Sequence, residues 1–261
     1  MKYKKDNLEA LSKEYIGRAI VIGKTNENIP FVTYILTGRS DSSKARILKF
    51  DERYGVTYTE PTDRAVLERG SPVLLLYPAI ASIDEGKIVV SNGAQTKLIL
   101  NQLMRSKGAN SSRSVLENSL GESFFEYDPK LGLIDITSFE PDEPNYTPRI
   151  SGCVIWENIS LAIARRGEDD KIEKEYNEFL LNAKSFGESK LIMTYNGVDT
   201  GKNPLNSFAG EPLDLRLTGK TEEDIAHKVR DAINPKTFIA VATQLALRGR
   251  KPCIINSNGG N

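Results

Sequence analysis

Histidine and cysteine are scarce in this chain, and that scarcity excludes several kinds of site. The 261 residues include one histidine, His227, and two cysteines, Cys153 and Cys253. Two cysteines are too few for a disulfide framework, and neither has the spacing of a metal ligand. His227 falls in TEEDIAHKVRDAI, off the apolar stripe that contains Ile225 and Val229, so we expect it to face solvent. The sequence therefore predicts neither a metal site nor a Ser-His-Asp triad.

Net charge and long apolar runs are also missing. Lysine plus arginine number 35 and aspartate plus glutamate number 35, whereas a nonspecific nucleic-acid binder is usually basic. No segment approaches the length of a membrane span. The first residues, MKYKKDNLEALSKEY, are charged and lack the apolar run of a signal peptide. We expect a single cytoplasmic domain over residues 1–261 that binds neither nucleic acid nor membrane.

Runs rich in Val, Ile, Thr and Tyr dominate the chain and predict strands. They are AIVIG, FVTYILTG, ARILKF, GVTYTE, VLLLY, KIVVSNG, the pair in SGCVIWENISLAIARR, KLIMTYNG and PLDLRLTG. FIAVATQLAL is compatible with a strand or a helix. Short polar connections between the runs favour hairpins and antiparallel sheets.

Three segments show helical rather than strand patterns. A short polar helix is predicted near the N-terminus, and the apolar spacing in residues 94–106 predicts another, followed by a polar stretch with Gly and Ser. In TEEDIAHKVRDAI, Thr221 and Asp224 have the spacing of a capping box. KIEKEYNEFLL is expected to be a short helix or an exposed loop. Because the strands are grouped, we predict an α+β domain in which two antiparallel sheets pack together under outer helices.

Four loop-like clusters carry more functional groups than folding requires. They are YIGR (residues 15–18), GRSDSSKAR (38–46), VVSNGAQT (89–96) and FEPDEPNYTPRISG (139–152). The second cluster holds three cations that could bind a phosphate, although a solvated hairpin turn uses the same residue types. In the last cluster three prolines lie within eight residues, which excludes a helix or a central strand and predicts a stiff loop.

Taken in order, YIGRAIVIGK, TGRSDSSKAR, SNGAQT and FEPDEPNYTPRISG resemble the IMP cyclohydrolase family of archaea and its bacterial relatives. The resemblance is best over roughly the first 155 residues, and the last block is its most specific part. It implies a four-layer α/β/β/α sandwich like that of the N-terminal-nucleophile hydrolases, without autoprocessing. It also implies ring closure of a formamidoimidazole-carboxamide ribonucleotide to IMP with loss of water, with no metal or other cofactor.

The resemblance also implies roles for individual residues. Tyr77, Glu140 and Lys44 match catalytic positions, although Lys44 stands where the archaeal pattern has arginine and Arg46 is the alternative. The matching substrate-binding positions are Arg18, Arg39, Arg46, Asn92, Asn145, Thr147 and Arg149.

Each of these residues could instead have a purely structural role. Tyr77 would then be a core tyrosine, Glu140 a surface carboxylate, and Arg149 a partner of the acidic residues in its own loop. For the whole chain, the alternatives are a non-catalytic purine-nucleotide binding protein and an amide hydrolase that cleaves itself, for which Gly152–Cys153 is a conceivable site. The expected ligand is a purine ribonucleotide, and association into a homo-oligomer is possible.

Overall fold

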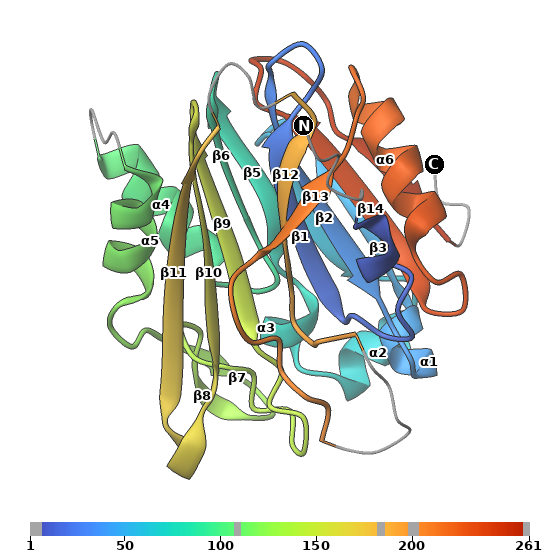
Figure 1. Cartoon of the computed structure of the whole chain (residues 1–261). Helices are drawn as coiled ribbons and strands as arrows, with labels where there is room; N and C mark the ends of the chain where they lie inside the picture. The colour runs from blue at the N-terminus through green and yellow to red at the C-terminus, as the bar shows by residue number, and fades with distance from the viewer. Residues whose placement is uncertain (1–6, 107–110, 182–185, 198–203, 258–261) are drawn as a thin grey trace.

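Two antiparallel sheets make up most of the computed structural model, which describes residues 7–106, 111–181, 186–197 and 204–257 (Figure 1). In spatial order, the six-stranded sheet consists of β13 (Leu213–Arg216), β12 (Glu188–Met193), β1 (Arg18–Lys24), β2 (Pro30–Thr37), β14 (Phe238–Leu245) and β15 (Cys253–Asn256). The seven-stranded sheet consists of β11 (Ile172–Leu180), β10 (Asn158–Arg166), β9 (Arg149–Ile155), β6 (Lys87–Ser91), β5 (Pro78–Asp84), β4 (Val56–Pro61) and β3 (Arg46–Asp51). A separate hairpin pairs β7 (Phe125–Asp128) with β8 (Gly132–Asp135).

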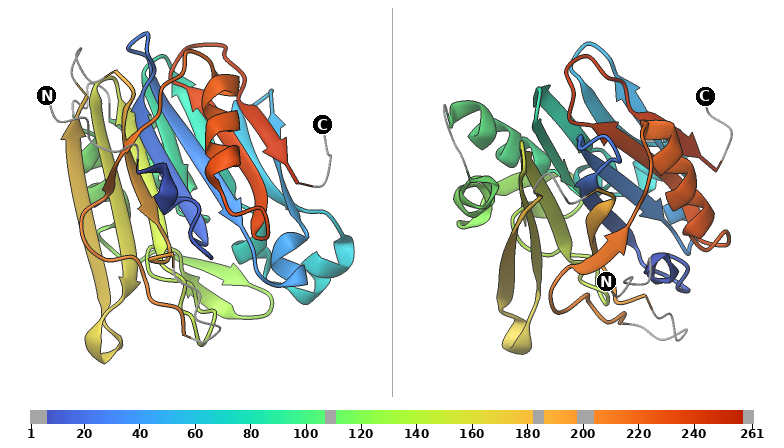
Figure 2. Two further views of the ribbon diagram at one scale, coloured as in Figure 1. Left: turned by 45° about the vertical axis from the view of Figure 1, so that its right-hand side comes forward. Right: turned by 45° about the horizontal axis from the view of Figure 1, so that its top comes forward.

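The longer helices lie on the outer faces of the two sheets (Figures 1 and 2). Helices α4 (Thr96–Arg105) and α5 (Ser112–Leu120) pack on the seven-stranded sheet, and α6 (Glu222–Ala232) packs on β14 and β15. Three short helices, α1 (Asp41–Lys44), α2 (Arg64–Arg69) and α3 (Pro72–Leu75), lie near one end of the sheets. The 3₁₀ turns are Leu8–Ala10 and Glu168–Asp170. The α+β class and its two antiparallel sheets are therefore confirmed. None of the helices in the described ranges has the length and apolar content needed to cross a membrane.

The two sheets pack face to face through a continuous apolar core. Strand β1 contacts β9, and β2 contacts β6, so the central strands of each sheet cover those of the other. Every residue of β1 and of β9 is buried. Gly152 shows how closely the strands approach, because a Cβ atom there would lie 2.6 Å from Ile22 Cδ1 and 2.9 Å from Val90 Cγ1.

Several local predictions are confirmed. The Thr221 hydroxyl accepts from the Asp224 amide at 3.2 Å and Asp224 accepts from the Thr221 amide at 3.2 Å, which completes the capping box of α6. His227 on α6 is exposed. FIAVATQLAL forms the strand β14, and SGCVIWENISLAIARR contributes to the hairpin β9–β10. The helix expected near the N-terminus falls partly on residues 1–6, which lie outside the described residues.

Two predictions are wrong, and seven elements were not predicted: α1, α2, α5, β5, β7, β8 and β15. VLLLY is not a strand: Pro72 occupies the first turn of α3, and the Ser71 hydroxyl accepts from the Leu74 amide as its N-cap. KIEKEYNEFLL is neither helix nor loop, because it forms the edge strand β11 along β10. The strand forms because its side chains alternate between the two faces of the sheet. Tyr176 packs toward the core under the helices, and Phe179 packs toward the core between the sheets.

The antiparallel registers bring distant segments to one end of the fold. Arg18 at the start of β1 is opposite Leu36 near the end of β2, and Ser91 at the end of β6 is opposite Ser151 near the start of β9. The same end holds α1 to α3 and the β7–β8 hairpin, at the bottom of Figure 1. The loop clusters singled out in the sequence therefore gather at this end.

Candidate active site

The proline-rich loop between β8 and β9 is irregular and is bonded to itself. The Glu140 amide donates to the Thr147 carbonyl at 2.8 Å, and the Thr147 amide donates to Asp142 Oδ1 at 2.6 Å. The Thr147 hydroxyl donates to Asp142 Oδ2. These bonds close the loop at its base. The prediction of neither helix nor central strand is confirmed over residues 139–148 but is wrong for residues 149–152, which begin the central strand β9.

Glu140 lies between two buried guanidinium groups. Arg18 Nη2 donates to Glu140 Oε1 at 2.5 Å, and Arg149 Nη1 lies 3.7 Å from the same oxygen. The three residues are 8%, 4% and 2% exposed in the order Arg18, Glu140, Arg149. Because β1 and β9 both start at this end of the sheets, the first residue of each strand projects its guanidinium toward the loop.

Both arginines have N–H groups without a hydrogen-bond partner among the described residues. Arg149 Nη1 donates to Gln95 Oε1 at 3.3 Å, but Arg149 Nε, Arg149 Nη2 and Arg18 Nε have no hydrogen-bond partner among the described residues. Burial lowers the pKa of Arg149, while attraction to Glu140 acts in the opposite sense. Buried donors are normally paired, so a water molecule or an acceptor oxygen of a ligand is expected at these groups.

A cavity of about 850 Å³ lies beside this cluster. Arg18, Glu140 and Asp142 line one part of it, and residues of α1, α2 and α3 with their flanking loops line the rest. Its volume falls in the range of small-molecule sites. Arg18 and Glu140 therefore border a space large enough for a small-molecule ligand, whereas Arg149 lies behind them and does not line it.

The cationic cluster at 38–46 contributes unequally to the cavity. Arg46 is buried, lines the cavity, and donates from Nε to the Ser43 carbonyl at 3.0 Å. Lys44 is exposed at the end of α1 and is not among the lining residues, and the Arg39 guanidinium lies 4.9 Å from the Tyr15 ring centre. Of the two cations considered for the catalytic role, Arg46 lines the cavity and Lys44 does not, and the catalytic role itself stays a prediction.

Tyr77 pairs with a tyrosine that the sequence analysis did not single out. It is 3% exposed, and its hydroxyl lies 2.9 Å from that of Tyr34 on β2. Burial and the neighbouring Tyr77 raise the pKa of Tyr34 well above its usual value. Tyr77 does not line the 850 Å³ cavity itself. Tyr34 sits in the middle of an apolar strand, so no local signal marked it.

The remaining predicted substrate-binding residues hold the loop in place. Asn92 accepts from the Ile150 amide at 2.8 Å and donates to the Pro148 carbonyl at 2.9 Å. Asn145 Oδ1 accepts from the Leu205 amide at 3.2 Å. None of Asn92, Asn145 and Thr147 lines the 850 Å³ cavity, and their contact with substrate stays a prediction.

Tyr195 and Asp142 complete a chain of polar groups under the loop. The Tyr195 hydroxyl lies 2.6 Å from Thr147 Oγ1, which in turn bonds Asp142. Tyr195 follows β12 as Tyr77 follows α3, and a tyrosine after an apolar run was the signal available for it. Asp142 was visible in the sequence only as one of several loop polar groups.

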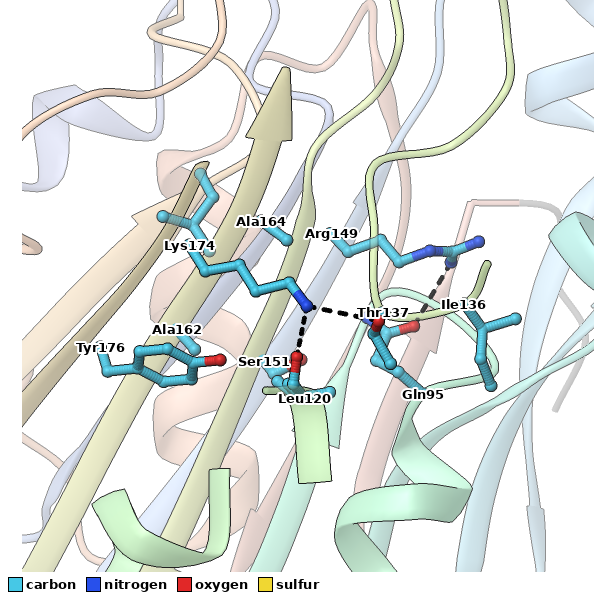
Figure 3. Close-up of a pocket in the computed structure, with 11 residues that line it drawn as sticks. Gln95, Leu120, Ile136, Thr137, Arg149, Ser151, Ala162, Ala164, Lys174 and Tyr176 are labelled. Carbon is cyan, nitrogen blue, oxygen red and sulfur yellow. Dashed lines mark hydrogen bonds between the residues drawn. The ribbon is translucent and has the colours of Figure 1, made fainter. Parts of the chain in front are cut away.

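A second, much smaller cavity lies beside Arg149 (Figure 3). Its volume is about 10 Å³, close to the room that one water molecule needs. Lys174 on β11 reaches across it and donates to the Leu120 carbonyl at 2.5 Å and to Thr137 Oγ1 at 3.4 Å. It is too small for a nucleotide, and these bonds join the edge strand to the end of α5.

Comparison with known proteins agrees with the motifs. Residues 15–249 match the family model described as IMP cyclohydrolase-like protein. A curated relative named IMP cyclohydrolase, from Methanococcus maripaludis (strain C6), is 23% identical over 237 residues, which cover 91% of this chain and 98% of the relative.

Proposed function

Because the chain belongs to the IMP cyclohydrolase-like family, we propose that it closes the pyrimidine ring of 5-formamidoimidazole-4-carboxamide ribonucleotide. The products would be IMP and water, in purine biosynthesis. The carboxamide nitrogen attacks the formyl carbon of the same molecule, so positioning the two groups face to face is a large part of the task.

One observation supports this reaction most directly: Glu140 lies between Arg18 and Arg149 beside the 850 Å³ cavity, and both arginines carry unpartnered donors. An amide nitrogen must lose a proton to form the ring, which a carboxylate such as Glu140 can accept. The formyl oxygen becomes an oxyanion when it is attacked, and buried guanidinium groups stabilise developing negative charge.

Cations at the cavity suit the 5′-phosphate of the substrate. Arg46 is the best placed, because it is buried, lines the cavity and is oriented by the Ser43 carbonyl. Arginine binds phosphate through a planar fork of donors. Lys44 and Arg39 belong to the same cluster. We propose that they add to the positive electrostatic potential around the phosphate without contacting it directly.

We also propose the finer classification of the fold. The two sheets with α4, α5 and α6 outside them are compatible with the four layers of an N-terminal-nucleophile hydrolase, formed by one domain over residues 1–261. Autoprocessing is not part of the proposal. Cys153 lies inside β9, is fully buried, and burial raises the pKa of its thiol, so it is poorly suited to act as a nucleophile. Assembly into a homo-oligomer stays a prediction.

The test is incubation of the purified chain with the formylated ribonucleotide while IMP formation is followed by ultraviolet absorbance. We expect enzyme-dependent IMP without added metal or cofactor. Glu140→Gln serves as the inactive variant, provided that urea unfolding shows it to be folded under the assay conditions. Tight binding of the ribonucleotide without any IMP would instead identify a purine-nucleotide binding protein.

A further inference from the structure

Ring closure needs two proton-transfer groups rather than one. Over the whole reaction one proton leaves the carboxamide nitrogen, one leaves the formamido nitrogen, and both leave with the formyl oxygen as water. When the N–C bond forms, one group must take a proton from nitrogen while another gives one to oxygen. Glu140 can fill only one of these positions at a time.

Asp142 is a second carboxyl group on the Glu140 side of the cavity, whose other carboxyl groups, Asp41 and Asp63, belong to α1 and to the N-cap of α2. It stands two residues after Glu140 in the loop and lines the cavity together with Glu140 and Arg18. Its environment differs, because no ion pair of Asp142 is recorded among the described residues and its closest partners are the amide and hydroxyl of Thr147. We propose that Asp142 is the general acid of ring closure and Glu140 the general base, an assignment that rests on the proposed cyclohydrolase activity.

The charges around the two carboxyl groups support this division. Arg18 and Arg149 both face Glu140. Burial, and then repulsion from Glu140, raise the pKa of Asp142 from 3.8 to about 6, against the opposing effects of Thr147 and Arg18. The other titratable groups nearby are Tyr195, behind Thr147, and Asp41, Arg46 and Asp63 on the far wall of the cavity. The two carboxyl groups therefore have different neighbours: Glu140 faces two guanidinium groups, and Asp142 faces the Glu140 carboxylate.

The protons balance over two steps. In the addition step the N–C bond forms, Glu140 takes the carboxamide proton, and the carbonyl electron pair moves to oxygen, which takes the proton of Asp142. In the elimination step the roles reverse: protonated Glu140 gives its proton to the hydroxyl as the C–O bond breaks. The Asp142 carboxylate then takes the formamido proton as the C=N bond forms. Both carboxyls return to their starting states, and one water is released.

The experiment is a pH profile of kcat/KM for IMP formation between pH 5 and 9. Since Asp142 acts in its protonated form, wild-type kcat/KM should fall as the pH rises above about 6. Asp142→Asn should lower kcat about 10²- to 10⁴-fold, and its residual activity should no longer show that fall. A role of Asp142 in loop structure alone would lower activity without removing the pH dependence.

Glu143→Gln is the matched control, because Glu143 is an exposed carboxyl of the same loop. It should leave kcat and the pH profile unchanged. If Asp142→Asn does not fold, Asp142→Glu replaces it, and the fall above about pH 6 should move to the pKa of the new carboxyl. An unmoved fall in Asp142→Glu, or near wild-type kcat in Asp142→Asn, would overturn the assignment. A wild-type chain that forms no IMP would overturn the cyclohydrolase proposal as well, so the two failures can be told apart.

Discussion

Arg18 Nη2 lies 2.5 Å from Glu140 Oε1, although 122 residues separate the two in the chain. Both side chains are nearly inaccessible to solvent. Breaking a buried ion pair by removing one partner typically costs about 3–5 kcal/mol, because the other charge is left uncompensated. The pair therefore carries structural as well as chemical importance.

We expect Glu140→Gln to lower both stability and turnover. The free energy of unfolding should fall by about 3–5 kcal/mol because Arg18 loses its partner, and kcat should fall about 10²- to 10⁴-fold. The double variant Arg18→Gln/Glu140→Gln should recover part of the stability without recovering turnover. Urea unfolding and steady-state kinetics on the single and double variants measure this. Additive losses of stability would show that the two side chains are not coupled.

Arg46→Gln should weaken substrate binding. Loss of a charge-assisted phosphate contact costs about 1.5–3 kcal/mol, so KM should rise about 10- to 150-fold while kcat changes little. Lys49→Gln is the control, because Lys49 lies on the same strand and its side chain is 49% exposed in a surface pair with Glu60. Lys44→Gln should raise KM less than Arg46→Gln. A larger effect at Lys44 would move the phosphate site to the outside of α1.

The two tyrosines should differ in their effects on catalysis. Tyr34→Phe and Tyr77→Phe remove opposite ends of one 2.9 Å hydroxyl contact, so each should lower the free energy of unfolding by about 0.5–1.5 kcal/mol. If Tyr77 acts in the reaction, Tyr77→Phe lowers kcat far more than Tyr34→Phe. Equal kcat values in the two variants would identify the contact as purely structural.

Asp142 should make the stability of the protein depend on pH. Its pKa is raised from 3.8 to about 6 in the folded state, so its proton contributes stability at low pH. That contribution is lost as the pH rises through about 6, and amounts to at most about 3 kcal/mol. Relative to wild type, Asp142→Asn should therefore gain stability between pH 4 and pH 8. Urea unfolding of wild type and Asp142→Asn at pH 4 and pH 8, with Glu143→Gln as control, tests this prediction. A difference that does not change with pH would contradict the raised pKa.

Local signals in the sequence were sufficient for much of the secondary structure. The capping box at Thr221 and Asp224 involves neighbours along one helix, and the β-branched runs of β1 and β2 favour strands in any context. They failed where tertiary contacts outweighed local preference. β11 is rich in charged residues and became a strand because β10 offers it an edge to pair with. VLLLY became part of α3 because Ser71 and Pro72 start a helix there.

The sequence by itself determined that a stiff polar loop, a cationic cluster and few metal-type ligands would be present, since these depend on residue identity and short spacing. It also named Arg18, Glu140 and Arg149 through the resemblance of their motifs. Only the tertiary structure decided that these three meet, that Arg46 rather than Lys44 lines the cavity, and that Tyr34 reaches Tyr77. It also decided that Asp142 is half-buried and close enough to Glu140 for desolvation and repulsion to raise its pKa. The physical reason is that sheet register and burial place groups from distant segments in one desolvated space, and no local pattern records that.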